Sequence, residues 1–330
     1  MRRIRLVYVA VVVLGCSAAI AGSPAGPRLA DYVAPAGSSW CVLPAGGVAV
    51  LEGRLGPVRT WDAAGRPVGT ITVVDAPVGG SPMPPAASRT HIALLWRGAD
   101  DGLVVQLYSL AGGRRIRELT FPSFPVTVTL GPGAIVMERL SLDDPAPLQV
   151  FDLTGRAVAT YPLPADLVRS LQRETGSVWL AHVRTFFAGA ELWGVPGGLY
   201  ELWHLGKAPS RVEVGPSQRV SGNHLTGETA TRWYEERGVA PGPRRAAAVW
   251  EPAVRQASPS GNTVAFLLED RPDAEGGRCR VDVWSFPGPK PGPSVRIPGP
   301  CPDAVYQGVS GLWLRRQGRV EWFPWATARR

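Results

Sequence analysis

A pair of short strand-like patterns occurs six times along this sequence. In each pair an apolar segment is followed by a segment of alternating apolar and polar residues, which carries an aromatic residue near its end. These aromatic residues are Trp61, Tyr108, Phe151, Trp203, Trp284 and Trp322. Alternation with a period of two is typical of β-strands, and self-similarity at a regular spacing indicates a repeat architecture. The chain is therefore expected to consist of six similar antiparallel units.

A recurring turn after the second strand supports this repeat. Residues 62–66 and 152–156 both have the form D-x-x-G-R, and a third strand pattern follows each of them at 67–73 and 157–163. The leading Asp can accept hydrogen bonds from the backbone ahead of it, and Gly supplies the positive φ that closes the turn. Four of the five intervals between the aromatic residues are 38 to 52 residues long, which fits blades of four short strands.

The two hairpins resemble those of a known group of proteins. VRTWDAAGRPV and LQVFDLTGRAV resemble the outer hairpin of six-bladed NHL-type propellers. SPSGNTVAFL, at residues 258–267, resembles the turn that enters a strand in TolB-like and WD-type blades. The resemblance covers about residues 40–325 and implies an all-β, six-bladed β-propeller. It assigns no binding residue, because these families place function in variable loops. A β-sandwich or an irregular β-solenoid is the alternative.

The two ends of the chain suggest how such a ring would close. The last strand pair ends near the C-terminus without a third strand, and a strand near Leu29 to Val33 could complete that blade. We therefore expect a propeller domain over residues 39–330 whose ring is closed by an N-terminal strand. Closure would remove open sheet edges, which otherwise expose unpaired backbone groups.

The first residues have the composition of an export signal. Arg2, Arg3 and Arg5 precede an apolar run at residues 6–14, and small residues follow. Residues 1–21 are therefore predicted to be a signal peptide, cleaved after Ala21. In the other interpretation residues 1–15 are a lipoprotein signal and Cys16 is lipidated. Either way, residues 22–38 are rich in Ala, Gly, Ser and Pro and are predicted to be a flexible tether. An uncleaved membrane anchor is a third option.

Besides Cys16, the chain has three cysteines. Cys279 and Cys301 lie 22 residues apart and flank one hairpin, so they are the preferred disulfide pair in an oxidising compartment. Cys41 would then be buried and free. Pairing of Cys41 with Cys301 across the ring closure is the second choice.

Two insertions interrupt the repeat. Residues 166–175 are predicted to form a short amphipathic helix. The larger insertion, at about 215–245, is polar and rich in Gly and Pro, and it contains Arg232, Trp233 and Tyr234. These three residues are a candidate binding loop for a carbohydrate, a peptide or an anionic ligand. Alternatively, Trp233 and Tyr234 attach the loop to the ring.

Motifs for specific chemistry are not found in this sequence. The four histidines do not occur at metal-ligand spacings, and neither a G-x-S-x-G elbow nor a phosphate-binding loop is present. We assign no catalytic residue, metal or cofactor. The formal net charge is +8, but the arginines are scattered, so a nucleic-acid surface is not expected.

These observations favour a binding or scaffold function. We expect an exported, monomeric, envelope-associated propeller, periplasmic or secreted, that binds a protein or glycan partner and contacts a membrane only through an N-terminal lipid anchor. A propeller enzyme, a hydrolase or lyase acting on extracellular carbohydrate, is the alternative and would require carboxylates or histidines at the channel mouth. A purely structural envelope subunit is the third possibility.

Overall fold

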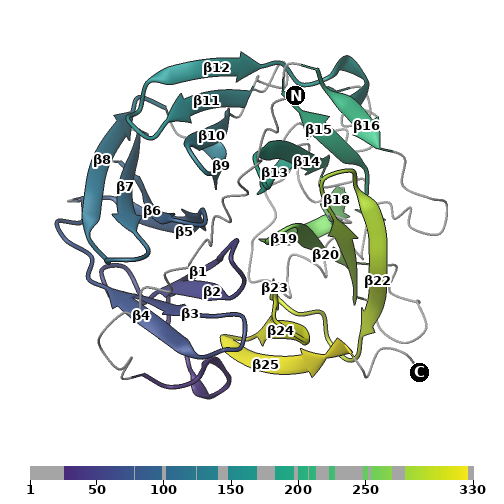
Figure 1. Ribbon diagram of the computed structural model, residues 1–330, viewed down its shortest axis with the longest axis horizontal. Coiled ribbons are helices and arrows are strands. Elements are labelled where there is room, and N and C mark those ends of the chain that lie inside the picture. The colour runs from purple at the N-terminus through teal and green to yellow at the C-terminus, as the bar shows by residue number, and fades with distance from the viewer. Residues whose placement is uncertain are drawn as a thin grey trace, which may run out of the picture.

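The protein is a ring of antiparallel sheets that form the blades of the ring, with one further two-stranded sheet (Figure 1). The computed structural model describes residues 26–77, 79–98, 102–123, 125–139, 148–168, 183–196, 200–206, 208–212, 223–226, 248–251, 254–269 and 279–325. Within these residues there are six blades around a central axis, so the predicted six-bladed β-propeller is confirmed.

The first three blades each have four strands, which follow one another from the innermost to the outermost. They are β1 (Ser39–Val42), β2 (Val48–Leu51), β3 (Val58–Trp61) and β4 (Pro67–Ile71); β5 (Ser81–Ala87), β6 (His91–Arg97), β7 (Leu103–Ser109) and β8 (Arg115–Phe121); and β9 (Pro125–Leu130), β10 (Ala134–Arg139), β11 (Leu148–Asp152) and β12 (Ala157–Tyr161).

The last three blades follow the same order. They are β13 (Val183–Ala188), β14 (Glu191–Pro196), β15 (Leu202–Leu205) and β16 (Ser210–Val212); β19 (Val254–Ser260), β20 (Thr263–Glu269), β21 (Cys279–Ser285) and β22 (Lys290–Ile297); and β23 (Ala304–Gln307), β24 (Gly311–Arg316) and β25 (Arg319–Pro324). Between the fourth and fifth blades, β17 (Asn223–Thr226) and β18 (Ala248–Glu251) form a separate hairpin inside the predicted insertion. Of the predicted helix at 166–175, residues 166–168 are helical and the rest lies outside the described residues.

The repeated aromatic residues pack between neighbouring blades. Trp61 and Trp284 are only 1% and 2% exposed, and Tyr108 is fully buried. A buried indole or phenol retains a polar group that needs a partner. The indole N–H of Trp61 donates to the carbonyl of Pro27 at 3.0 Å, and the hydroxyl of Tyr108 accepts the N–H of Val74 at 3.1 Å. Trp61 and Tyr108 therefore fill the core and also fix neighbouring segments of chain.

The D-x-x-G-R turns have the predicted structure. Asp62 Oδ1 accepts the N–H groups of Ala64 and Arg66, both at 2.9 Å, and Oδ2 accepts from the Arg66 side chain at 2.8 Å. Gly65 has a φ of +71°, and a Cβ there would lie 2.5 Å from the ring of Trp313. Glycine is thus required both by the backbone conformation and by the contact with the last blade.

The second copy of the turn repeats these contacts. Asp152 Oδ1 accepts the N–H groups of Thr154 at 2.9 Å and Arg156 at 3.1 Å. The Thr154 hydroxyl, followed by the backbone N–H groups, lowers the pKa of the Asp152 carboxyl to about 2. The ionised carboxylate is therefore the form that organises this turn.

Removing the carboxylate from the first turn is expected to have a measurable cost. Asp62→Ala should lower the free energy of unfolding by about 1 kcal/mol, because two backbone N–H groups lose their internal acceptor and must bind water instead. Asp62→Asn keeps an acceptor at the same position and should lose only a few tenths. Urea unfolding of the three proteins measures the difference. An equal loss in both variants would mean that the ion pair with Arg66, not the turn, is important.

The ring closes differently from the prediction. The segment expected to be a strand is a 3₁₀ turn, η1 (Leu29–Asp31), and the last blade keeps three described strands. Leu29 and Tyr32 are both buried in the core between the first and last blades, while Ala30 and Asp31 are exposed. A spacing of three directs both side chains to the same side in a 3₁₀ turn, whereas a strand would direct them to opposite faces.

The same segment corrects the predicted tether. Leu29 donates its N–H to the carbonyl of Gly65 at 2.9 Å, and the hydroxyl of Tyr32 donates to Glu52 at 2.7 Å. At least Pro27 to Tyr32 therefore packs as part of the propeller, which does not begin at residue 39. Burial of Leu29 and Tyr32 is sufficient to hold a segment whose Ala, Gly, Ser and Pro content alone suggested a flexible chain.

Side chains also join neighbouring blades near the axis. Gln256 accepts the N–H of Val305 at 2.7 Å, and Gln307 donates to the carbonyl of Ser258 at 2.6 Å. Both bonds connect the innermost strands of the fifth and sixth blades. Because buried polar groups that are fully paired favour one arrangement of the backbone, these bonds fix the angle between the two blades.

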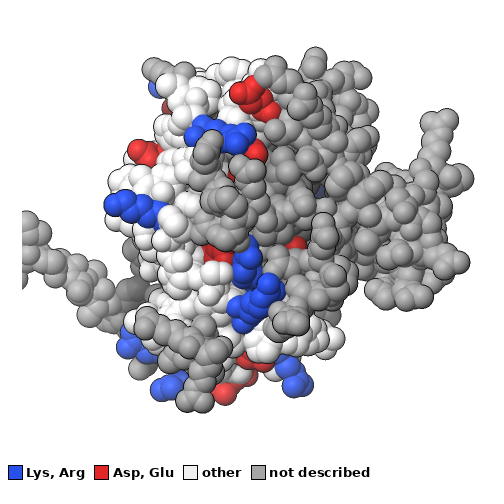
Figure 2. Space-filling view, turned by 90° about the vertical axis from the view of Figure 1, so that its right-hand side faces the viewer, with Lys and Arg blue, Asp and Glu red and all other residues white. Residues whose placement is uncertain are grey.

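The outer surface carries charges of both signs. Figure 2 shows the side of the ring around β16 and β22, where Lys and Arg side chains are interspersed with Asp and Glu among the described residues. The described part of the chain contains no helix long and apolar enough to cross a membrane.

Candidate functional site

The central channel is the site at which all the blades meet. Residues that closely follow five innermost strands line one pocket, so these strands end at the same face of the ring. We call this face the end face and the opposite one, where the strands begin, the start face. Residues in the second halves of five innermost strands, β1, β5, β9, β13 and β19, together line a cavity of about 170 Å³ in the channel. The channel therefore has two ends of different composition.

Towards the end face most of the side chains that line the channel are apolar. Its walls include Val42, Leu130 and Phe186, together with several alanine and proline residues. The hydroxyls of Thr129 and Thr185 also face this region but bond to each other at 2.6 Å. Such a surface provides few groups for acid–base chemistry and fits an apolar group.

Cys41 also lines this cavity, and its side chain packs in the core between the first and second blades. It is free, as predicted, and it is 8% exposed. Burial raises the pKa of Cys41 to about 12. The group is therefore a neutral thiol near pH 7 and behaves as a small apolar side chain, not as a nucleophile.

Near the start face, four charged residues from three blades lie close together. Glu138 is on β10, Arg184 on β13, Arg255 on β19 and Glu269 on β20. Arg255 pairs with Glu269 at 3.2 Å, and Arg184 Nε donates to the carbonyl of Arg255 at 3.2 Å. We call these four residues the start-face cluster.

Glu138 joins the third blade to the fourth. Its carboxylate accepts the N–H of Val183 at 3.0 Å and the hydroxyl of Thr127 at 3.3 Å. Burial raises the pKa of Glu138 to about 7, although both hydrogen bonds and the nearby Arg184 guanidinium lower it. Because its desolvation outweighs these contacts, this carboxyl titrates near neutral pH.

Arg184 is incompletely paired. Its Nη1 atom is buried and has no hydrogen-bond partner. Burial lowers the pKa of Arg184 to about 10, and the opposing effect of Glu138 is smaller. The guanidinium nevertheless stays charged near pH 7. The start face therefore carries a cation with one nitrogen, Nη1, that has no hydrogen-bond partner.

Neutralising Glu138 should change how stability depends on pH. The pKa of this carboxyl is about 7 in the folded protein and 4.5 as a model group, so folding is favoured below pH 4.5 and this contribution is lost as pH rises through 7. Glu138→Gln removes the titration. Between pH 5 and pH 8 the free energy of unfolding of the variant should rise by on the order of 2 kcal/mol relative to that of the wild type. A shift of one pKa unit corresponds to about 1.4 kcal/mol, and relaxation of the site reduces the full effect.

Urea unfolding at pH 5, 6, 7 and 8 would measure this difference. Thr127→Val is the control: it removes a hydrogen bond from the same carboxylate but keeps the titrating group, so it should retain the pH dependence of the wild type. Parallel stability curves for wild type and Glu138→Gln would show that Glu138 is already ionised at pH 5, contrary to the proposed burial effect.

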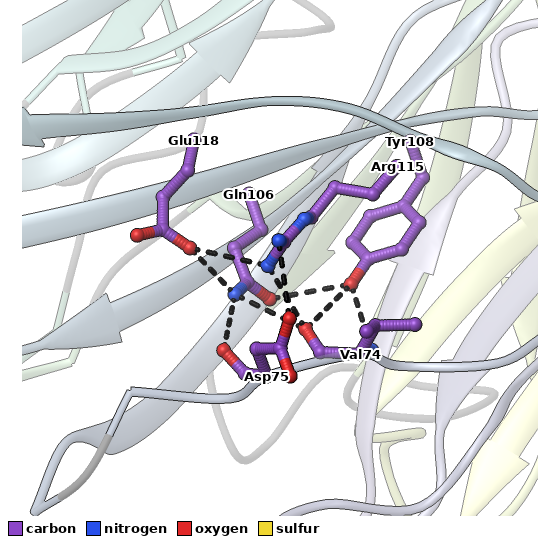
Figure 3. Close-up of polar contacts among 6 residues, drawn as sticks. All are labelled: Val74, Asp75, Gln106, Tyr108, Arg115 and Glu118. Carbon is purple, nitrogen blue, oxygen red and sulfur yellow. Dashed lines mark hydrogen bonds and ion pairs between the residues drawn. The ribbon is translucent and has the colours of Figure 1, made fainter.

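A second polar cluster lies in the second blade, away from the channel. Figure 3 shows it: the participating residues are Val74, Asp75, Gln106, Tyr108, Arg115 and Glu118. The amide of the fully buried Gln106 donates to the carbonyl of Asp75 at 2.8 Å and to Glu118 at 2.9 Å. Arg115 donates to the carbonyl of Val74 at 3.2 Å.

This cluster has a structural explanation. Val74 and Asp75 belong to the connection between β4 and β5, and the other four residues lie on β7 and β8. Asp75 has a φ of +51°, an uncommon conformation for a residue other than glycine. Its carboxylate pairs with Arg115 at 3.2 Å. The contacts therefore attach the connection between two blades to the body of the second blade.

The described histidines are in structural positions. His91 bonds the hydroxyl of Thr90 at 2.8 Å, and His204 lies against the ring of Trp193 with centroids 5.0 Å apart. Within the described ranges no group of three or more His, Cys, Asp or Glu side chains is placed to hold a metal ion.

The predicted site residues fall into two groups. Cys279 and Cys301 form a disulfide with Cα atoms 5.3 Å apart, which connects the fifth blade to the segment before the sixth. Cys16, Arg232, Trp233 and Tyr234 lie outside the described residues. The start-face cluster was not found from the sequence. The available signal was a charged residue next to apolar strand residues, as in AIVMER and VRTFFA.

Comparison with known proteins assigns no function to the chain. No protein-family model matches the sequence, and no curated protein matches it significantly. A chain of the mitotic checkpoint complex is similar in structure, with 11% identity, a TM-score of 0.45 and coverage of 87% of this chain and 88% of that one. A streptogramin B lyase structure has 11% identity, a TM-score of 0.44 and coverage of 90% and 97%. At these identities neither likeness extends to function.

Proposed function

We propose that this protein is an exported propeller of the bacterial cell envelope that binds a protein or glycan partner at the start face of its ring. The start-face cluster is the observation that carries the proposal. Two arginines from the fourth and fifth blades lie together there, and one of them has a buried Nη1 without a partner. Charged groups fixed on a rigid scaffold provide directional recognition of a polar partner.

A binding role fits this site better than catalysis because of how its carboxylates are held. Glu138 accepts from a backbone N–H and a hydroxyl, and Glu269 pairs with Arg255 at 3.2 Å. A general acid or base needs a proton-transfer atom within reach of a substrate. The Glu138 carboxylate instead joins the third blade to the fourth, and the Glu269 carboxylate is paired with Arg255 within the fifth blade.

The proposal also includes export of the chain, the way its N-terminus is processed, and its relationship to known propeller groups. The basic and apolar N-terminal residues support export, with cleavage after Ala21 or lipidation at Cys16. The Cys279–Cys301 disulfide is consistent with an oxidising compartment such as the periplasm. The two D-x-x-G-R turns support kinship with NHL-type propellers, and residues 258–267 support kinship with TolB-like ones.

The proposal is tested by expressing the full chain with a C-terminal tag in a bacterium. Export predicts that mass spectrometry of the purified protein finds a first residue of Gly22 or a lipidated Cys16. Cross-linking in intact cells, followed by detergent extraction, should then recover a defined partner with wild type. Arg255→Glu should lose it, because this substitution reverses a charge on the start face.

Arg117→Glu is the matched control. It makes the same charge change on the exposed outer strand β8 and should keep the partner. Retention of the partner by Arg255→Glu would reject the start face as the contact site. An uncleaved chain in the cytoplasm would reject export, and reproducible hydrolytic or lyase turnover by the purified mature chain would reject a purely binding role.

A further inference from the structure

The apolar cavity of the channel continues to a cationic rim at the end face. A second, smaller pocket shares Pro44, Leu130 and Phe187 with the first cavity and extends to Ser88 and Arg89. Leu130 and Phe187 lie at the ends of innermost strands, and Pro44, Ser88 and Arg89 lie in the turns that follow such strands. The two pockets therefore adjoin, and the smaller one lies at the end face of the ring.

The inner part of this site is suited to a compact apolar group. Its volume of about 170 Å³ is close to that of engineered protein cavities of about 150 Å³ that bind benzene. Phe186, Leu130 and Val42 supply apolar walls, and the two threonine hydroxyls are paired with each other. Because most lining side chains are apolar and the two hydroxyls already bond each other, an apolar body matches this site better than a charged one.

Among the described residues that line the smaller pocket, Arg89 is the one with a charged side chain. Arg89 is exposed and follows the buried Ser88 at the tip of the β5–β6 turn. In the part of the chain that the structure describes, Arg89 forms no ion pair or side-chain hydrogen bond. A guanidinium of this kind can bind a carboxylate through two parallel hydrogen bonds.

We infer that the end-face half of the channel binds a small amphipathic carboxylate, with its apolar body in the cavity and its carboxylate at Arg89. Ligand pockets commonly combine an apolar lining with a few polar groups that fix orientation. The site lies at the opposite end of the channel from the start-face cluster, so the inference does not rest on the proposed partner.

Cys41 is a built-in reporter for this site. Cys41 lines the cavity, and its thiol is the one left free by the Cys279–Cys301 disulfide in a chain cleaved after Ala21. Methylmercury is small enough to follow an apolar channel and reacts with buried thiols. The rate of Cys41 modification therefore measures whether the cavity is occupied.

The probes are 3-phenylpropionate and its neutral amide, which have nearly the same shape and differ in charge. At ten times its Kd, the carboxylate should slow the modification of Cys41 about tenfold, and it should raise the melting temperature in parallel. The amide should bind about threefold more weakly, because it lacks the exposed ion pair with Arg89.

Two variants separate the parts of the inference. Arg89→Gln should make the carboxylate and the amide equally protective, while Arg117→Gln, on an outer strand, should keep the preference for the carboxylate. Ala257→Leu places extra methyl groups in the cavity and should remove protection by both probes. If Ala257→Leu does not fold, the Arg89→Gln comparison alone still decides the charge preference.

Three results would overturn the inference. The first is that neither probe, at a 50-fold excess over the protein and up to its solubility limit, changes the modification rate of Cys41 or the melting temperature of the wild type. The second is that both probes protect Cys41 equally in the wild type. The third is that the preference for the carboxylate persists in Arg89→Gln. None of these results depends on export or on a macromolecular partner, so each leaves the proposed function unaffected.

Discussion

Trp61→Ala is expected to lower the free energy of unfolding by roughly 4 kcal/mol, the range typical for removing a buried aromatic side chain. Trp61 is 1% exposed and lies where the ring closes. Its ring lies 4.6 Å from that of Tyr32, between centroids, and its indole N–H holds the carbonyl of Pro27 at 3.0 Å. The substitution therefore leaves a cavity and also releases the N-terminal segment.

Trp61→Phe separates these two effects. Phenylalanine retains most of the apolar volume but cannot form the hydrogen bond to Pro27. Trp61→Phe should therefore lower the free energy of unfolding by about 1 to 2 kcal/mol. Limited trypsin digestion should then cleave faster after Arg28 in Trp61→Phe than in wild type. Chemical unfolding measures both variants. A loss below 1 kcal/mol in Trp61→Ala would show that the first and last blades are held together without this core.

Removing the disulfide is expected to have the second largest effect. The loop closed by Cys279 and Cys301 spans 22 residues. Opening a loop of this length should lower stability by about 3 kcal/mol in the chain-entropy description. Cys279 is fully buried on β21, and Cys301 lies in the segment between β22 and β23. The bond therefore restricts how the fifth and sixth blades can separate.

The variant Cys279→Ala with Cys301→Ala is compared with wild type in the presence and absence of a reductant. Reduction should destabilise wild type and leave the double variant unchanged. Cys41→Ala is the control: it removes a buried free thiol but keeps the response to reductant. A wild type whose unfolding is insensitive to reductant would show that the two sulfurs are not bonded in solution.

The fold was largely predictable because its periodic signals are local. The aromatic residue at the end of each third strand, such as Trp61 or Trp284, and the Asp–Gly pair of each D-x-x-G-R turn act within a few residues of chain. Strand alternation is likewise a property of five to seven consecutive residues. The strand pairs were therefore located close to the bounds that the structure has.

The N-terminal segment was harder to predict. The expected strand at Leu29–Val33 and the expected tether at 22–38 were both judged from composition. Which conformation forms depends on a core assembled from residues more than 270 positions apart, including Leu29 and Trp313. No local sequence pattern indicates that the side chains of Leu29 and Tyr32 are buried in the same core.

The candidate site depended still more on the tertiary structure. Glu138, Arg184 and Arg255 lie on three different blades, and each is an ordinary residue in its own strand. Their shared position, and the raised pKa of Glu138, follow from burial at the channel end. The free thiol of Cys41 was expected, but its place on the channel wall was not.

The sequence by itself determined the number of blades, the middle strands of each blade and the turns between them, because repeated apolar and polar alternation fixes which faces must be buried. Only the tertiary structure decided how the ring closes and which side chains meet in the channel. Those contacts join residues that are distant along the chain, and their energies depend on the burial that the complete ring creates.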